Sequence, residues 1–307
     1  IETAAPVDRD KFAAAHLAFA TDGAVVTVRP GAVVEAPIVV DVQATQAGTI
    51  TFPHLEFSVG ANAQAGLIVV YRSPEGLEAV VVPDIVLTAQ DGAQLRFMSV
   101  QGWAEATTGL AHQRLQLGRD ATGRIGEVGL GGKVARLDLK VDLEGAGSSA
   151  EVVGVYFGED NQTLDYRMTI NHIGRNTTSD VFMKGAVEDH AQSVFTGLLR
   201  IEKDAVRSSA FETNRNLVLS ENAKAHSVPN LEILCNDVMC GHGSSVGPLE
   251  EEYIYYLQSR GISRERAERM LVRGFFSEVI ERLPIDTLAE PIEEAVFSRF
   301  TQAPEEG

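Results

Sequence analysis

The chain has few cysteines, no long apolar run and few basic residues, and each of these absences excludes a class of protein. It has only two cysteines in 307 residues, which is far too few for a disulfide scaffold. No apolar run approaches the ~20 residues needed to cross a bilayer, and no basic and apolar leader segment opens the chain. Basic residues are scarce as well: 26 Lys and Arg against 43 Asp and Glu give a net charge of −17. Such a surface repels phosphate backbones, so we expect no nucleic-acid partner. Without an apolar span we expect no membrane partner, and we interpret the two cysteines as reduced thiols in a cytoplasmic protein.

Between Ala24 and Leu234 the sequence is almost entirely strand-like, and a helix of ten or more periodic residues is hard to find. Short stretches rich in Val, Ile and Leu alternate with polar residues and are separated by Gly, Asn, Asp and Ser. A small motif with Ala beside Gly or a polar residue recurs at strand entries: residues 60–63, 91–94, 145–148, 188–191 and 221–224. Small residues at a repeating bend favour a β-solenoid, and a β-sandwich with many short strands is the competing interpretation.

After Gly247 the pattern changes to helices. Acids at Glu250–Glu252 and an apolar face through Leu257 predict a first helix that stops at Gly261. Ser263 is typical of an N-cap for a second helix, which Pro284 ends, and a weaker helix follows from Pro291 to Phe300. We therefore expect three regions: an N-terminal region over 1–23, a β-solenoid core over 24–247 and a C-terminal helical segment over 248–307.

The candidate chemistry lies in Pro229–Gly247, which holds both cysteines and His242 between two glycines. Cys240 and His242 are two apart and would project from one face of a strand, as soft and borderline donors suited to iron or zinc. One Cys and one His cannot close a four-ligand site, so a metal there needs ligands from another chain. A buried structural Cys beside a surface His is the plainer interpretation. Cys235 suits a core thiol, and His226, at a bend, suits either a ligand or a hydrogen-bonded surface histidine.

Common catalytic signatures are missing. We find no nucleophile elbow, no phosphate loop and no H-E-x-x-H motif, and the glycine-rich stretch 126–132 has no helix after it. The carboxylates form no obvious pair by spacing. A β-helix lyase or hydrolase acting on carbohydrate stays open as an alternative, because such an enzyme assembles its acids from distant coils.

The stretch PNLEILCNDVMCGHGSSVGPLEEEYIYYLQSRGI, from Pro229 to Ile262, resembles the C-terminal signature of the SufB/SufD family of iron–sulfur cluster assembly scaffolds. Upstream, Thr213–Leu217, Ala225–Pro229 and Gly174–Gly185 fit the same family. The resemblance spans about residues 171–283. The chain is similar to the SufD branch of this family. The SufB branch carries its proposed cluster-building cysteine at the position where this chain reads Glu221–Lys224, without a thiol.

The resemblance implies a right-handed parallel β-helix and a non-catalytic scaffold that pairs with a SufB-like subunit through its last coils. It implies no cofactor held stably by this chain alone, and a transient cluster or iron at the subunit junction, with His242, Cys240 and, more weakly, His226 as ligands. The C-terminal helices would dock the ATPase SufC, with the contact residues Tyr253, Tyr256, Leu257, Arg260, Phe275 and Phe276. In isolation the chain could form a homodimer, and residues 1–23 would be the remnant of a longer N-terminal region.

Overall fold

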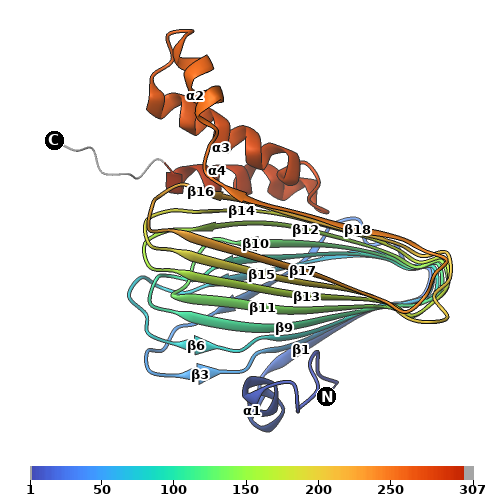
Figure 1. Ribbon diagram of the computed structural model, residues 1–307. Helices are drawn as coiled ribbons and strands as arrows, with labels where there is room; N and C mark the ends of the chain where they lie inside the picture. Colours follow the sequence, from blue (N-terminus) through green and yellow to red (C-terminus); the bar gives the residue numbers. More distant parts are fainter. Residues whose placement is uncertain (1, 301–307) are drawn as a thin grey trace.

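The computed structural model describes residues 2–300 and shows a β-solenoid with helices at both ends of the chain (Figure 1). Two parallel sheets face each other, and the chain passes from one to the other in about eight turns. Every strand pair that we find in these residues is parallel. A β-sandwich would pair its strands antiparallel, so the solenoid prediction is confirmed.

The first sheet, sheet A, takes one strand from each coil. Its main path runs in the order β1 (Gly23–Val28), β4 (His54–Val59), β7 (Asp84–Ala89), β9 (Thr108–Leu117), β11 (Val134–Leu143), β13 (Thr163–His172), β15 (Gln192–Ile201) and β17 (Lys224–Ile233). Two short strands, β3 (Ile50–Thr51) and β6 (Val80–Val81), join it at the side.

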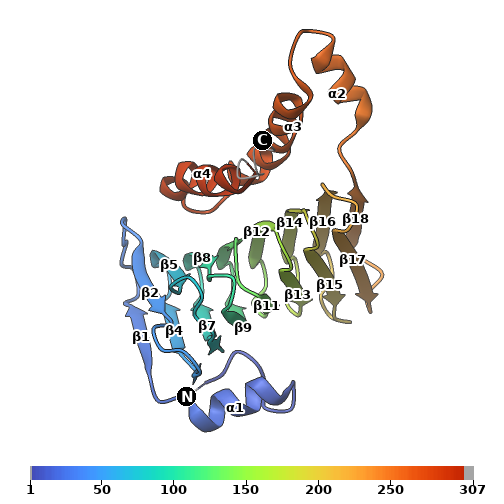
Figure 2. The same cartoon turned by 90° about the vertical axis from the view of Figure 1, so that its left-hand side faces the viewer.

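Sheet B supplies the opposite wall of each coil. From the C-terminal end backwards its order is β18 (Met239–Gly247), β16 (Ser209–Val218), β14 (Thr178–Val187), β12 (Ser149–Gly158), β10 (Thr122–Gly129), β8 (Gln94–Gly102), β5 (Gln64–Arg72) and β2 (Ile38–Gln43). Figure 2 shows the two sheets as adjacent walls of one stack.

Alternation of side chains builds the core between the sheets. In β13 every second residue is buried, so Leu164, Tyr166, Met168 and Ile170 point inward while their neighbours are partly exposed. Strand side chains alternate between faces, and the apolar row of each coil stacks on the next. No coil buries its apolar residues alone, which is why the repeat pattern in the sequence indicated this fold.

The predicted small-residue motif forms the corners of the coils. At one corner, residues with positive φ stack from coil to coil, and each donates its backbone N–H to a carbonyl of the next coil. The column comprises Asn62, Gly92, Asp120, Gly147, Asn176 and Arg207. Beside it the corner alanines Ala63, Ala93 and Ala121 are fully buried. Gly, Asn and Asp reach this left-handed region most easily, which explains why they recur there.

The helices lie outside the solenoid. At the N-terminal side α1 (Lys11–Phe19) is capped by Asp10, whose carboxylate accepts from the N–H groups of Phe12 and Ala13. At the other end come α2 (Glu251–Gln258), α3 (Arg264–Ile280), the 3-10 turn η1 (Asp286–Leu288) and α4 (Ala289–Phe300). Ser263 caps α3 as predicted, but α3 ends at Ile280, before Pro284. No helix among residues 2–300 has the length and apolar character needed to span a bilayer.

Helices α3 and α4 pack on the outer face of sheet B. A second apolar cluster joins Phe276, Val279 and Val296 of these helices to strand residues such as Val155 and Phe157. Polar contacts fix the same surface: Lys184 Nζ lies 2.6 Å from Glu278 Oε2, and Arg282 pairs with Glu151 at 3.0 Å and with Asp180. This outer layer anchors the helical segment on the middle coils of the solenoid.

Candidate functional site

The C-terminal end of the solenoid is open. Strand β17 pairs only with β15, and β18 only with β16, so within residues 2–300 nothing covers the far edge of either strand. Several large apolar side chains of this last coil are exposed: Val228, Leu231, Leu234, Met239 and Val246. Unpaired parallel edges with exposed apolar residues offer a template for another strand. The predicted ligand stretch therefore lies on a surface that is suited to a second polypeptide.

Cys240 and His242 lie in one row of β18. Their Cα partners on β16 are Ala210 and Glu212, both of which belong to the buried inner row of that strand. The row of β18 that continues it holds Cys240, His242, Ser244 and Val246. Cys240 is half-buried against the main core, whereas His242 is exposed. The two donors thus face the solenoid interior at the place where that interior opens.

The glycines beside His242 are not required by local packing. A Cβ at Gly241 would meet Phe211 at 3.5 Å, and one at Gly243 would lie 4.0 Å from Thr213, both of which are ordinary contacts. What the glycines do is leave the outer row of β18 without side chains on either side of His242. A partner backbone could therefore approach this strand closely.

A polar row lies directly beneath the donors, and the sequence analysis did not single it out. Glu212 is 1% exposed and neither carboxylate oxygen has a hydrogen-bond partner in the described residues. Burial raises its pKa to about 7. A Cβ at Gly197, across the interior, would lie only 2.0 Å from Glu212 Oε2, so that glycine makes room for the carboxylate. The interior below His242 therefore holds a carboxyl group that titrates near neutrality.

The polar row continues past Glu212. Asn214 donates to the Tyr156 hydroxyl at 3.2 Å, Asn216 donates to the Asn214 side-chain oxygen at 2.7 Å, and the Tyr156 hydroxyl donates back to Asn216. These groups satisfy one another and fix the polar part of the inner row of β16. The alternation of Glu, Asn and Asn in the otherwise apolar inner row was the available sequence signal.

The other thiol and histidines lie elsewhere. Cys235 follows β17, is buried and belongs to the main core, which confirms the prediction of a core thiol; both cysteines are free. His226 is opposite Val194 on the outward row of β17 and is exposed, so the structure does not bring it to the row of Cys240. His172 is fully buried, with its two ring nitrogens on the hydroxyls of Thr177 and Ser179.

The helices present a second candidate surface. On α2, Tyr253 and Tyr256 are more than half exposed, and the Arg260 guanidinium lies 4.3 Å over the Tyr256 ring. Leu257 is half-buried. Only Ile254 of this helix is buried, so most of its apolar face has no partner in the described residues.

The two phenylalanines of α3 lie in different environments. Phe276 is fully buried against sheet B, so it anchors α3 and does not offer a partner surface; this corrects the expectation for that residue. Phe275 is half-buried, with Lys184 Nζ 4.8 Å over its ring. The apolar arc of α3 is wide enough that sequence spacing did not separate anchoring from exposed residues.

The outer face of sheet A is where a β-helix lyase or hydrolase would hold its acidic residues. It carries rows of acids and bases, but the acids are engaged by cations: Asp138 by Arg9 at 2.6 Å, and Asp142 by Arg114 at 2.9 Å and Lys140 at 3.2 Å. Glycoside hydrolysis uses two carboxyl groups that face each other across a sugar. The arrangement here is an ion-pair network, and it does not favour that activity.

Comparisons with known proteins agree with the resemblance in the sequence. Residues 42–275 match a family model described as "SUF system FeS cluster assembly, SufBD core domain". An iron–sulfur cluster assembly SufBD family protein of Mycobacterium leprae is 34% identical over 303 residues, covering 96% of this chain and 76% of the relative.

Two relatives carry the name SufD. The iron–sulfur cluster assembly protein SufD of Escherichia coli is 32% identical over 182 residues, covering 59% of this chain and 43% of that protein. SufD of Bacillus subtilis is 28% identical over 286 residues, covering 91% of this chain and 64% of that protein.

Proposed function

Because this chain belongs to the SufBD family of iron–sulfur cluster assembly proteins, we propose that it is the SufD-like scaffold subunit of an assembly complex. In this proposal its open C-terminal coil pairs with a SufB-like subunit, and its α2–α3 segment docks a SufC-like ATPase. The cluster, or its iron, is the cargo built at the subunit junction. One observation carries the proposal: Cys240 and His242 lie in the inner row of a terminal strand whose outer edge is unpaired.

Pairing through the last coil follows from the chemistry of the open edge. Strands β17 and β18 each offer unpaired backbone groups, and adding a strand satisfies them while burying Val228, Leu231 and Val246. A second solenoid end matches this surface, because it offers the same two edges at the same spacing. The same argument allows a homodimer when the SufB-like subunit is absent.

The number of donors on this chain is too small to hold a cluster alone, so in this proposal both chains supply ligands at the junction. Cys240 and His242 give two soft or borderline ligands, whereas iron–sulfur clusters are usually held by four protein ligands. The remaining donors would come from the SufB-like chain, because the family resemblance implies a cysteine there at the position that reads Glu221–Lys224 in this chain. His226 lies on the outward face of β17, so its role as a ligand depends on contacts made only in the complex.

ATPase docking rests on the exposed face of α2. Tyr253, Tyr256 and Arg260 form an aromatic and cationic surface of the kind that interfaces favour. Helix α2 contacts α3 through an exposed ion pair between Arg264 and Glu251, and α3 is anchored on sheet B. An ATPase that binds α2 would therefore be coupled mechanically to the solenoid.

The test is co-expression of this chain with its SufB-like and SufC-like neighbours, followed by the native mass of the complex and its iron and sulfide content. His242→Ala and Cys240→Ser should leave the mass unchanged and lower the cluster content, and Ser244→Ala, in the same row, is the matched control. Unchanged cluster content in His242→Ala would refute the ligand role alone. Failure of the wild-type chain to form a complex would refute the pairing.

A further inference from the structure

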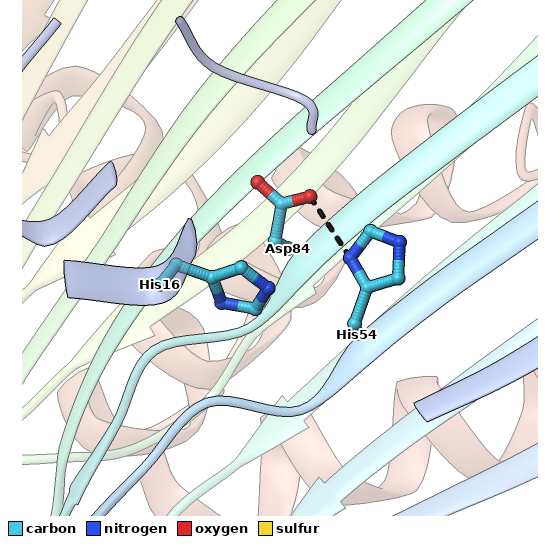
Figure 3. Close-up of side chains that lie close together, drawn as sticks. All are labelled: His16, His54 and Asp84. Atoms are coloured by element: carbon cyan, nitrogen blue, oxygen red, sulfur yellow. Dashed lines mark ion pairs between the residues drawn. The ribbon is translucent and has the colours of Figure 1, made fainter. Parts of the chain in front are cut away.

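A buried cluster of three metal-ligand side chains lies far from the open C-terminal end. It consists of His16 on α1, His54 at the start of β4 and Asp84 at the start of β7 (Figure 3). His54 and Asp84 are Cα partners on the outward row of sheet A, and α1 places His16 over them. Their exposed fractions are 7%, 1% and 0% for His54, Asp84 and His16. The three donor atoms lie within 4.8 Å of one another.

The hydrogen bonds of His16 leave a lone pair aimed into the cluster. Its Nδ1 lies 3.1 Å from the Val82 carbonyl oxygen, which can only accept, so Nδ1 carries the proton. Nε2 is then an acceptor, and it has no hydrogen-bond partner among residues 2–300 although the side chain is fully buried. A neutral imidazole with one nitrogen held by a carbonyl is the form that binds metals.

His54 is held by a carboxylate on each side. Its Nε2 lies 3.1 Å from Glu56 Oε1, and its Nδ1 pairs with Asp84 Oδ1 at 3.3 Å (Figure 3). Asp84 accepts the Ala4 N–H at 3.0 and 3.1 Å. Glu56 thus occupies the position of the carboxylate that commonly supports a ligating histidine. With Asp84 it supplies two negative charges, which balance a divalent cation.

His172 shows what a purely structural buried histidine looks like in this protein. Both of its ring nitrogens are engaged by hydroxyl groups, at 2.7 and 2.8 Å. The neighbouring His112, the Cα partner of Asp84 on β9, has Nε2 3.4 Å from Asp10 Oδ2. His16 Nε2 and His54 Nδ1 instead converge with the Asp84 carboxylate around one point.

We propose that His16, His54 and Asp84 bind a divalent transition-metal ion of the zinc class, which fastens α1 to the first coils of the solenoid. Two imidazole nitrogens and one carboxylate are the donor set of many zinc and ferrous sites, with the remaining position taken by water or the second carboxylate oxygen. The ligands come from residues 16, 54 and 84, so the ion would cross-link the N-terminal segment to two strands. This site is independent of the proposed cluster junction.

The test is metal binding by the full chain after chelator treatment, in a Cys240→Ser/His242→Ala background that removes the two donors of β18. Titration with Zn²⁺ should show one equivalent bound and a rise in melting temperature, whereas Mg²⁺ should have no effect, because it disfavours nitrogen ligands. Co²⁺ should bind at the same site with a visible spectrum typical of nitrogen and oxygen ligands. Absence of Zn²⁺ binding in this background would overturn the proposal.

Two variants locate the ion. His16→Ala and the isosteric Asp84→Asn should each weaken Zn²⁺ binding by about 100-fold or more, and His190→Ala, an exposed histidine at a corner, is the matched control. Asp84→Asn keeps the side-chain volume, so we expect the variant to fold, and circular dichroism checks this. Wild-type affinity in a folded Asp84→Asn chain would also overturn the proposal.

Discussion

Both ends of the solenoid have exposed strand edges, but the side chains behind those edges differ in polarity. At the N-terminal end, strands β1 and β2 leave Val25 and Val39 exposed, much as β17 and β18 leave Val228 and Val246 exposed at the other. Behind the N-terminal edge the inner row is apolar, with residues such as Leu67. Behind the C-terminal edge it holds a free carboxyl group, two amides and two donors of the last strand. Exposed strand edges therefore mark where a partner fits, and only the side chains behind them indicate what is assembled there.

The largest expected effect comes from placing a charge on each edge in turn. Val228→Asp on β17 should weaken pairing with the SufB-like subunit by about 30-fold or more, because a carboxylate would be buried beside a neighbouring strand. Val39→Asp is the matched change on β2, since both valines are outward and exposed. The measurement is the dissociation constant of the two purified subunits. Equal weakening by both variants would refute the assignment of pairing to one end.

An effect on stability, and not on binding, should appear in the pH dependence at the C-terminal end. Burial raises the pKa of Glu212 to about 7 from an ordinary 4.5, so the folded state binds the proton more tightly than the unfolded chain does. Stability from this group is complete below about pH 4.5 and is lost as pH rises through about 7, by about 3 kcal/mol at most.

Glu212→Gln removes that dependence and should stabilise the isolated chain at pH 8 by about 1–3 kcal/mol, while changing little at pH 4.5. Urea unfolding at both pH values measures this, and Glu221→Gln, at an exposed corner position, is the control. Other buried acids titrate in the same range, so the quantity compared is the difference between variant and wild type. A difference that does not change with pH would contradict the assignment.

The smallest effect belongs to the N-terminal end. Asp10→Ala removes the cap of α1, whose carboxylate accepts two N–H bonds at 2.9 Å, and should weaken this helix by about 1 kcal/mol. Amide hydrogen exchange in α1 should then quicken about 5-fold. Exchange in β17 and β18 should not change. A response at both ends would show that the two ends are coupled, which the stacking of independent coils does not predict.

The sequence predicted the architecture because the repeat leaves a local signal. The corner motif places Gly, Asn or Asp at a left-handed position beside a buried Ala, and both preferences are visible in short windows. The Cys240–His242 stretch was found for the same reason, since two donors on one strand are neighbours in the chain. The row to which they belong depends on register with β16, which is a non-local property.

Sites that join distant coils escaped the sequence analysis for a related reason. His16, His54 and Asp84 are brought together by the docking of α1 on sheet A, and no spacing rule connects them. The Glu212 carboxylate fits into the interior only because Gly197, on the opposite sheet, has no side chain there. Phe276 was assigned to the wrong side of α3 because its helix has apolar residues on more than one face.

The anchoring of α3 has a mechanical consequence. Its ion pairs, Lys184 with Glu278 and Arg282 with Glu151 and Asp180, lie on β12 and β14, whereas α2 stands off sheet B near the last coil (Figure 2). The helical segment is therefore fixed at the middle coils, and its free part, α2, lies near the open end. A force applied to α2 would act about the anchor on β12 and β14, and the short link from Gly247 to Glu251 would pass part of it to the strand that bears His242.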